Sequence, residues 1–423
     1  MPDLPSHTPP DVPSPRRKPA FWPAAAIFAL MGAFFWTIRG TDGFGGSQGG
    51  ILAGLGWAML WLGFSRRFGD ERRRPYGHGH VVAAILLGIA CGGLTGYGVY
   101  ISWVQGRFHL DYPDGVREIA PWTGYAMLFC CGLHWGGLTG VFMAWCAPRR
   151  PLGAAGWMGR LAAGLVGAVA AYGIVVAFPS WFLPFHDEGL YADPANKTCL
   201  RAAGSIRNIA PHVGAYAGFL AFEALRRDVR AVAVISIMGL GFALSFSLGA
   251  VWQTFYGVGP DLDWWKFWEM SIGVGGGLTF ALVFHRFNRP EASAPPRSVT
   301  ASERVVSAGA LVWLATATVL ANGLDGWSRR HGVEIPPAFG QVAGILIAAA
   351  LGFLHLRSPG RMMPRWLIPL ALGAIVVAGF AASLPPELRL ADQVLLLIYL
   401  ICVAGSLGCF LWLRHVRNPL ATT

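Results

Sequence analysis

The sequence predicts an all-α polytopic integral membrane protein of about 12 transmembrane helices, arranged as six hairpins. The first reason is composition, because hydrophobic residues make up 54% of the 423-residue chain and charged residues only 13%. The second is a mean hydropathy of +0.48. The third is the abundance of glycine, 56 residues, which suits membrane helices that approach one another through small side chains.

Twelve apolar windows account for the predicted helices, each long enough to cross most of a hydrocarbon layer ~30 Å thick. They cover residues 21–38, 48–64, 80–104, 122–146, 159–178, 209–225, 231–254, 267–287, 303–321, 338–356, 364–384 and 391–413. Residues 1–19 are rich in Pro and Ser, which predicts a disordered cytoplasmic tail. Since this tail does not resemble a cleavable secretory signal, we expect the first helix to be retained.

The distribution of basic residues predicts the orientation of the chain. Each even-numbered window is followed by arginines, namely Arg66-Arg67, Arg149-Arg150, Arg226-Arg227, Arg286 with Arg289, Arg357 with Arg361, and Arg414 with Arg417. By the positive-inside rule, these ends and both termini are cytoplasmic, with the protein in the cell membrane, the inner membrane of a bacterium. The net charge of +11 therefore predicts a lipid bilayer and not nucleic acid as the partner.

The polar, Pro-rich residues 288–304 predict a cytoplasmic linker between two membrane modules. Residues 20–287 form an eight-helix module, in which the functional site is expected. Residues 305–423 form a plainer four-helix module, expected to serve as scaffold or as the contact face of a homo-oligomer through helices 9 to 12.

Similar glycine-rich entries in the first eight windows favour parallel internal repeats. Residues 49–54, 136–140 and 276–280 each begin with two glycines followed by an apolar residue. The alternative is convergence, since closely spaced glycines are common wherever membrane helices pack. The sequence leaves both interpretations open.

The most distinctive stretch is residues 36–50, between the first two apolar windows. Arg39, Asp42 and Gln48 lie there among six glycines, and charged residues at membrane depth are costly unless they face a cavity or an interface. Exposed backbone N–H groups and the start of the next helix would suit an anionic or polyhydroxylated ligand. The alternative is an interfacial arginine neutralised by Asp42.

Three further polar residues are candidates for the same cavity. His134 lies well inside the fourth window, where a polar side chain needs a partner or water. His212 enters the sixth window at a comparable depth, although simple helix capping also explains it. Gln253 follows Trp252 at the end of the seventh window, in a segment that resembles residues 36–40.

Other kinds of chemistry receive little support from the sequence. The seven cysteines include no C-x-x-C pair, and His78 with His80 provides only two potential ligands, so no metal site is predicted. No phosphate-binding G-x-x-x-x-G-K-[ST] motif occurs, and no cofactor is expected.

Two functions of different class fit these features. The first is a secondary transporter or permease for a small polar or anionic solute, with an outward-side polar cavity in which Arg39, Asp42, Gln48, His134, His212 and Gln253 bind solute or coupling ions. The second is a membrane-embedded transferase for a lipid-linked sugar or acyl donor, with Asp42 or residues 186–188 of the long third outer loop as the base. A structural membrane subunit without substrate is the third alternative. The glycine breaks and His134 favour transport.

Overall fold

The computed structural model describes residues 21–67, 71–111, 115–291, 298, 311–356 and 366–415, and the structural statements below refer to these residues. The predicted tail at 1–19 and most of the predicted linker at 288–304 lie outside them. The regular secondary structure of the described residues is helical apart from one short antiparallel pair of strands, β1 (Arg107–His109) with β2 (Val116–Glu118). The helices are α1 (Phe21–Ile38), α2 (Gly46–Arg67), α3 (Gly79–Gly92), α4 (Ile101–Val104), α5 (Trp122–Cys146), α6 (Ala154–Ala177), α7 (Lys197–Leu225), α8 (Val229–Gly249), α9 (Trp264–Phe287), α10 (Leu311–His331), α11 (Pro337–Leu356), α12 (Leu367–Ser383) and α13 (Leu390–His415).

Every predicted window contains a helix, but the window at 80–104 is not a continuous one. Helix α3 ends at Gly92, and the chain turns before the short α4 begins at Ile101. The chain packs tightly where the helix ends. A side chain at Gly92 would collide with Trp135, and one at Gly93 would collide with the backbone at Gly46. The prediction of one helix over residues 80–104 was therefore wrong.

Six helices surround an aromatic centre. Helices α1, α2, α3, α5, α8 and α9 pack against one another in that order, and α9 packs back against α1. Trp36 of α1 lies in the middle, with ring centroids 5.6 Å from Trp57, 4.9 Å from Trp135 and 5.6 Å from Phe246. Large side chains from four helices thus fill the interior of the ring.

Glycines set the closest approaches between these helices. A Cβ atom on Gly273 of α9 would lie 2.1 Å from the carbonyl oxygen of Gly32 on α1. A Cβ atom on Gly136 of α5 would lie 2.1 Å from the carbonyl oxygen of Met238 on α8. These glycines are therefore needed for packing, which either interpretation of the repeated glycine pattern would require.

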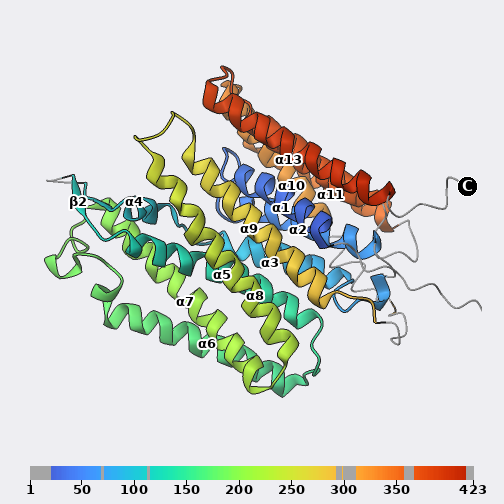
Figure 1. The fold of residues 1–423 in the computed structure, drawn as a ribbon, viewed down its shortest axis with the longest axis horizontal. Helices are drawn as coiled ribbons and strands as arrows, with labels where there is room; N and C mark the ends of the chain where they lie inside the picture. Colours follow the sequence, from blue (N-terminus) through green and yellow to red (C-terminus); the bar gives the residue numbers. More distant parts are fainter. Residues whose placement is uncertain are drawn as a thin grey trace, which may run out of the picture.

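The remaining helices cover two opposite sides of the ring (Figure 1). Helix α7 packs on α5, and α6 packs on α7. On the other side α10 and α12 pack on α2, and α13 packs on α1. The four-helix module predicted at the C-terminus is therefore in direct contact with the first two helices.

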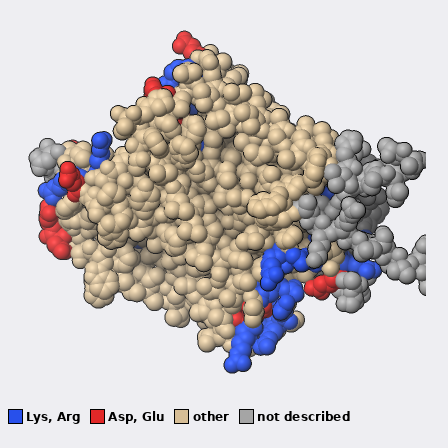
Figure 2. All heavy atoms as spheres, viewed as in Figure 1, with Lys and Arg blue, Asp and Glu red and all other residues tan. Residues whose placement is uncertain are grey.

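The surface suits a lipid environment. Six helices or helical stretches are long and apolar enough to cross a membrane: Phe21–Ile38, Trp122–Cys146, Ala154–Ala177, Val229–Phe255, Trp264–Phe287 and Leu390–Leu413. Helix α6 exposes apolar side chains such as Leu165 and Val169 on its outer face. Charged side chains gather near the ends of the helices, and a broad uncharged surface separates them (Figure 2). These features fit a multi-pass helical membrane protein.

Candidate functional site

Arg39, the first residue after α1, is buried inside the ring of helices with 4% of its surface exposed. Its guanidinium carbon lies 4.7 Å from the ring centroid of Trp36, 5.1 Å from that of Tyr97 and 4.9 Å from that of Trp135. Aromatic faces attract cations, more strongly where water is excluded. Three aromatic rings thus hold a positive charge that would otherwise be poorly solvated.

Glu269 and Lys266 of α9 complete a buried charged cluster around Arg39. An oxygen of Glu269 lies 3.8 Å from the Arg39 guanidinium, and the other carboxylate oxygen lies 3.0 Å from Lys266 Nζ. Lys266 also donates a 3.0 Å hydrogen bond to the carbonyl oxygen of Thr37. The cluster, defined here as Arg39, Lys266 and Glu269, contains two cations and one anion.

Local backbone features hold these three side chains in place. Gly40 leaves room for the Glu269 carboxylate, because a Cβ atom at residue 40 would lie 2.2 Å from its oxygen. Helix α9 begins in the loop beside the cluster because Asp263 caps it, accepting a 3.1 Å hydrogen bond from the backbone N–H of Lys266. Since Lys266 and Glu269 are three residues apart, they share one face of that first helical stretch.

The break after α3 contributes two residues to the site. Tyr97 stacks on Arg39 and contacts Trp268, with ring centroids 5.3 Å apart. Thr95 places its hydroxyl 2.6 Å from Nε2 of His134 and 3.0 Å from the carbonyl oxygen of Gly92. A continuous helix over these residues would not present both side chains to the interior in this way.

His134 and His212, both predicted as cavity residues, lie next to each other. His134 is fully buried on α5, and its Nδ1 lies 3.3 Å from the carbonyl oxygen of Cys130. The half-buried ring of His212 on α7 is centred 5.4 Å from that of His134. Because His134 directly precedes Trp135, the histidine pair adjoins the aromatic rings around Arg39.

Gln253 lies in the 3₁₀ helix Ala250–Phe255, in the connection between α8 and α9. Its side chain is buried and donates a 3.3 Å hydrogen bond to the carbonyl oxygen of Trp264. Its own backbone carbonyl accepts a 2.9 Å hydrogen bond from Gln105. The side-chain oxygen of Gln253 has no hydrogen-bond partner among the described residues. Gln253 thus supports the start of α9 and leaves one polar atom unused.

Asp42 and Gln48 lie outside the charged cluster. Asp42 is 61% exposed, and its carboxylate oxygen is 3.3 Å from Nε of Arg330 on α10. Gln48 is exposed at the start of α2. The expectation that Asp42 could neutralise Arg39 was wrong, because α1 ends at Ile38 and the following turn, with Gly43 at φ +82°, directs Asp42 toward α10.

Four residues of this site were not predicted from the sequence, namely Lys266, Glu269, Tyr97 and Thr95. A usable signal was present in residues 264–269, where a lysine and a carboxylate three residues apart stand among tryptophans at the start of an apolar window. Trp268 of that segment is fully buried against Tyr97 and Phe246, and so does not belong to a lipid-facing aromatic belt.

The long segment between α6 and α7, predicted as an outer loop and as the catalytic segment of a transferase, is attached to the hairpin of β1 and β2. Glu188 forms an ion pair with Arg117 of β2, and the backbone N–H of Thr198 donates a 2.7 Å hydrogen bond to Asp111. His186 lies 3.6 Å from Asp187, whose side chain is 86% exposed. Within the described ranges no three His, Cys, Asp or Glu side chains come together to hold a metal ion.

The chain matches no protein-family model, no curated protein and no solved structure. A function is therefore argued from the chemistry of the buried cluster and its neighbours.

Proposed function

We propose that this protein is a secondary transporter for a small anionic solute, with the cluster of Arg39, Lys266 and Glu269 as the solute site. One observation carries the proposal: the cluster is buried, holds one more positive than negative charge, and leaves Nε of Arg39 without a hydrogen-bond partner among the described residues. Charged side chains buried at membrane depth are costly and most often mark substrate or ion pathways.

An anionic group would satisfy this site better than the protein alone does. The planar guanidinium of Arg39 can bind a carboxylate or phosphate through two parallel hydrogen bonds. Glu269 lies 3.8 Å from Arg39, beyond hydrogen-bond distance, so a solute can compete with it for the Arg39 guanidinium, whereas Lys266 holds Glu269 at 3.0 Å. Glu269 then acts as the internal counter-ion that occupies the site when solute leaves.

The histidine pair provides a means of coupling transport to protons. A histidine is the side chain that ordinarily changes its charge near neutral pH, and His134 lies beside Trp135, which packs on Arg39. Thr95 connects His134 to the break after α3. Protonation of the half-buried His212 on one side of the membrane would favour the entry of an anion next to the pair.

Solute exchange in proteoliposomes tests the proposal. The purified protein is reconstituted and supplied with a panel of labelled acetate, lactate, succinate and inorganic phosphate, with and without a pH gradient. We expect at least one anion to exchange above the rate of protein-free vesicles, and Glu269→Gln to change its apparent affinity. Exchange of none of them would remove the support for an anion transporter and return attention to the transferase alternative.

A further inference from the structure

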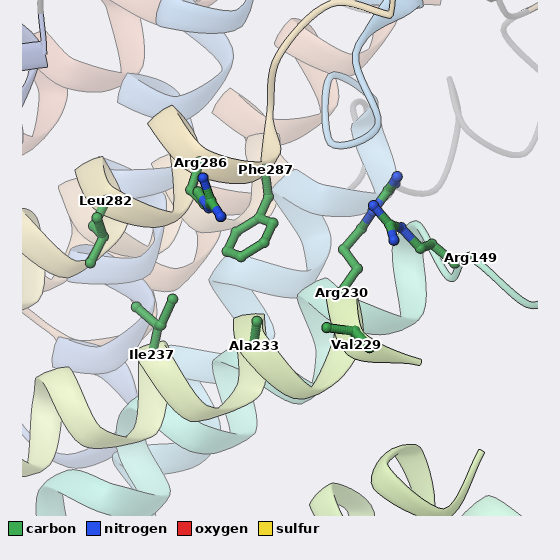
Figure 3. A pocket seen from close by; sticks show the side chains of 8 residues that line it. All are labelled: Arg149, Val229, Arg230, Ala233, Ile237, Leu282, Arg286 and Phe287. Carbon is green, nitrogen blue, oxygen red and sulfur yellow. The ribbon is translucent and has the colours of Figure 1, made fainter. Parts of the chain in front are cut away.

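A groove of about 400 Å³ lies between the start of α8 and the end of α9 (Figure 3). Lys266 and Glu269 lie at the other end of α9. Three arginines form the rim of the groove: Arg149 after α5, Arg230 in the first turn of α8, and Arg286 in the last turn of α9. Its walls are apolar and include Ile237 and Leu282. The groove therefore combines a cationic rim with a hydrophobic floor.

The rim carries more positive charge than the nearby carboxylates neutralise. Arg230 pairs with Glu291 at 3.4 Å. The carboxylate of Asp228 is occupied by the backbone N–H groups of Arg149 and Ala231, at 3.0 and 3.1 Å. In the part of the chain that the structure describes, the guanidinium groups of Arg149 and Arg286 form no ion pair and no side-chain hydrogen bond.

An exposed apolar track continues from the groove along both helices. On α8 it consists of Leu240, Leu244 and Leu248, and on α9 of Leu282, Leu278 and Val274, all spaced by four residues and exposed. From Ile237 to Leu248 a helix rises roughly 16 Å, about the depth of one leaflet of a ~30 Å hydrocarbon layer. The track begins at the arginine rim and leads away from it.

We propose that this groove binds an anionic diacyl phospholipid such as phosphatidylglycerol. The phosphate lies between Arg149 and Arg286, and one acyl chain follows the leucine track between α8 and α9. Two features of the groove select this occupant together, since a free anion gains nothing from the apolar track, and the quaternary ammonium of a zwitterionic lipid such as phosphatidylcholine is repelled by the arginine rim. The rim also lies at the ends where arginines follow the even-numbered windows, which are predicted to face the cytoplasmic leaflet and its anionic lipids.

Native mass spectrometry of the full-length protein in neutral detergent tests this site. The protein is titrated with phosphatidylglycerol, phosphatidylcholine or inorganic phosphate. The test variant is Arg149→Gln with Arg286→Gln. The matched control is Arg201→Gln with Arg207→Gln, which removes two exposed arginines from the first half of α7. Melting temperatures without lipid show whether each variant is folded.

We expect the wild-type protein to bind phosphatidylglycerol in preference to phosphatidylcholine. The test variant should bind phosphatidylglycerol roughly thirtyfold more weakly, since each arginine beside an anionic headgroup contributes a factor of about five. The control variant should bind as the wild type does. Should the double variant fail to fold, Arg286→Gln alone should weaken binding about fivefold.

Three results would overturn the proposal. The first is equal binding of the two lipids, and the second is an equal loss of binding in the control variant. The third is displacement of phosphatidylglycerol by inorganic phosphate at equal concentration, which would indicate a free-anion site. None of these measurements depends on transport. A negative result for lipid binding therefore leaves the proposed transport function standing, and a negative result for solute exchange leaves the lipid site standing.

Discussion

At the scale of single residues, the described structure separates two charged side chains that stand three positions apart. Arg39 turns inward to three aromatic rings and Glu269, whereas Asp42 turns outward to Arg330. The burial of each charged side chain determines how much its contacts contribute to the free energy of folding. A cation inside a desolvated aromatic cage gains about 2 kcal/mol from those rings, whereas an exposed ion pair such as Asp42 with Arg330 contributes about 0–1 kcal/mol.

Arg39→Lys and Asp42→Asn therefore form an informative pair of variants. Lys retains the charge but loses the planar group that stacks on the aromatic rings and binds an anion in two places, so we expect anion exchange to fall about tenfold or more. Asp42→Asn should leave exchange near the wild-type rate, although the sequence alone singled out Asp42 as a site residue. Exchange rates in proteoliposomes, with melting temperatures as the check on folding, provide the measurement. Equal losses in both variants would place the site at the turn and not in the buried cluster.

The sequence predicted part of this site for a clear physical reason. Arg39, His134 and Gln253 were singled out because charged and polar groups at membrane depth are expensive, and all three are buried. Glu269 and Lys266 were passed over although they lie at the boundary of the predicted window 267–287, where charged residues are ordinary at a membrane interface. Only the packing of α9 against α1 shows that this segment lies inside the ring beside Arg39.

At the scale of helices, the packing of α1 against α9 brings the charged cluster together. A Cβ atom on Gly277 of α9 would lie 2.0 Å from the carbonyl oxygen of Phe28, and one on Gly273 would meet Gly32. These contacts lie on the same pair of helices as the charged cluster. They are about one to three helical turns from Arg39, which follows α1, and from Lys266 and Glu269, which lie at the start of α9. Any side chain added at Gly273 or Gly277 must push the backbones of α1 and α9 apart and so disturb the charged cluster.

Gly277→Ala should therefore destabilise the protein by about 1–3 kcal/mol, the usual cost of overpacking. Gly173→Ala on α6 is the matched control, because no atom lies within 4 Å of a Cβ placed there. Alanine is the better helix former by about 1 kcal/mol, so the control should melt at or slightly above the wild-type temperature. Thermal unfolding in detergent measures both variants. A Gly277→Ala protein as stable as the wild type would mean that α1 and α9 pack less closely than described.

The break after α3 shows where sequence reasoning about elements fails. Residues 80–104 are apolar enough for one long helix, and glycines inside membrane helices are common. The end of α3 makes a long-range contact, the close approach of Gly93 to Gly46 at the start of α2. Since hydropathy contains no information on that contact, the window appeared continuous, and Thr95 and Tyr97 were missed with it.

At the scale of the whole molecule, helix positions were predicted well and the number of membrane crossings is still a prediction. Helices occur in all twelve windows, but among the described residues six stretches satisfy the length and hydropathy expected of a span. The glycines and polar residues of α2 and α7 lower their hydropathy, yet α2 belongs to the inner ring. We favour twelve crossings with both termini cytoplasmic, because the arginine clusters follow every second window.

Residue 289 distinguishes twelve crossings from six. With a cytoplasmic N-terminus, eight crossings precede residue 289 in the twelve-helix topology, which places it inside. Only five precede it if the six most apolar stretches span, which places it outside. Residue 187 lies outside in both topologies and serves as the matched control. A membrane-impermeant maleimide applied to intact cells, with the seven native cysteines replaced, should therefore label Asp187→Cys at once and Arg289→Cys only after permeabilisation. Labelling of both in intact cells would favour six crossings. It would also separate Arg149, which follows two of the six stretches, from Arg230 and Arg286, which lie beyond three and five, and so would contradict the 3.0 Å hydrogen bond that joins Arg149 to Asp228 at the start of α8.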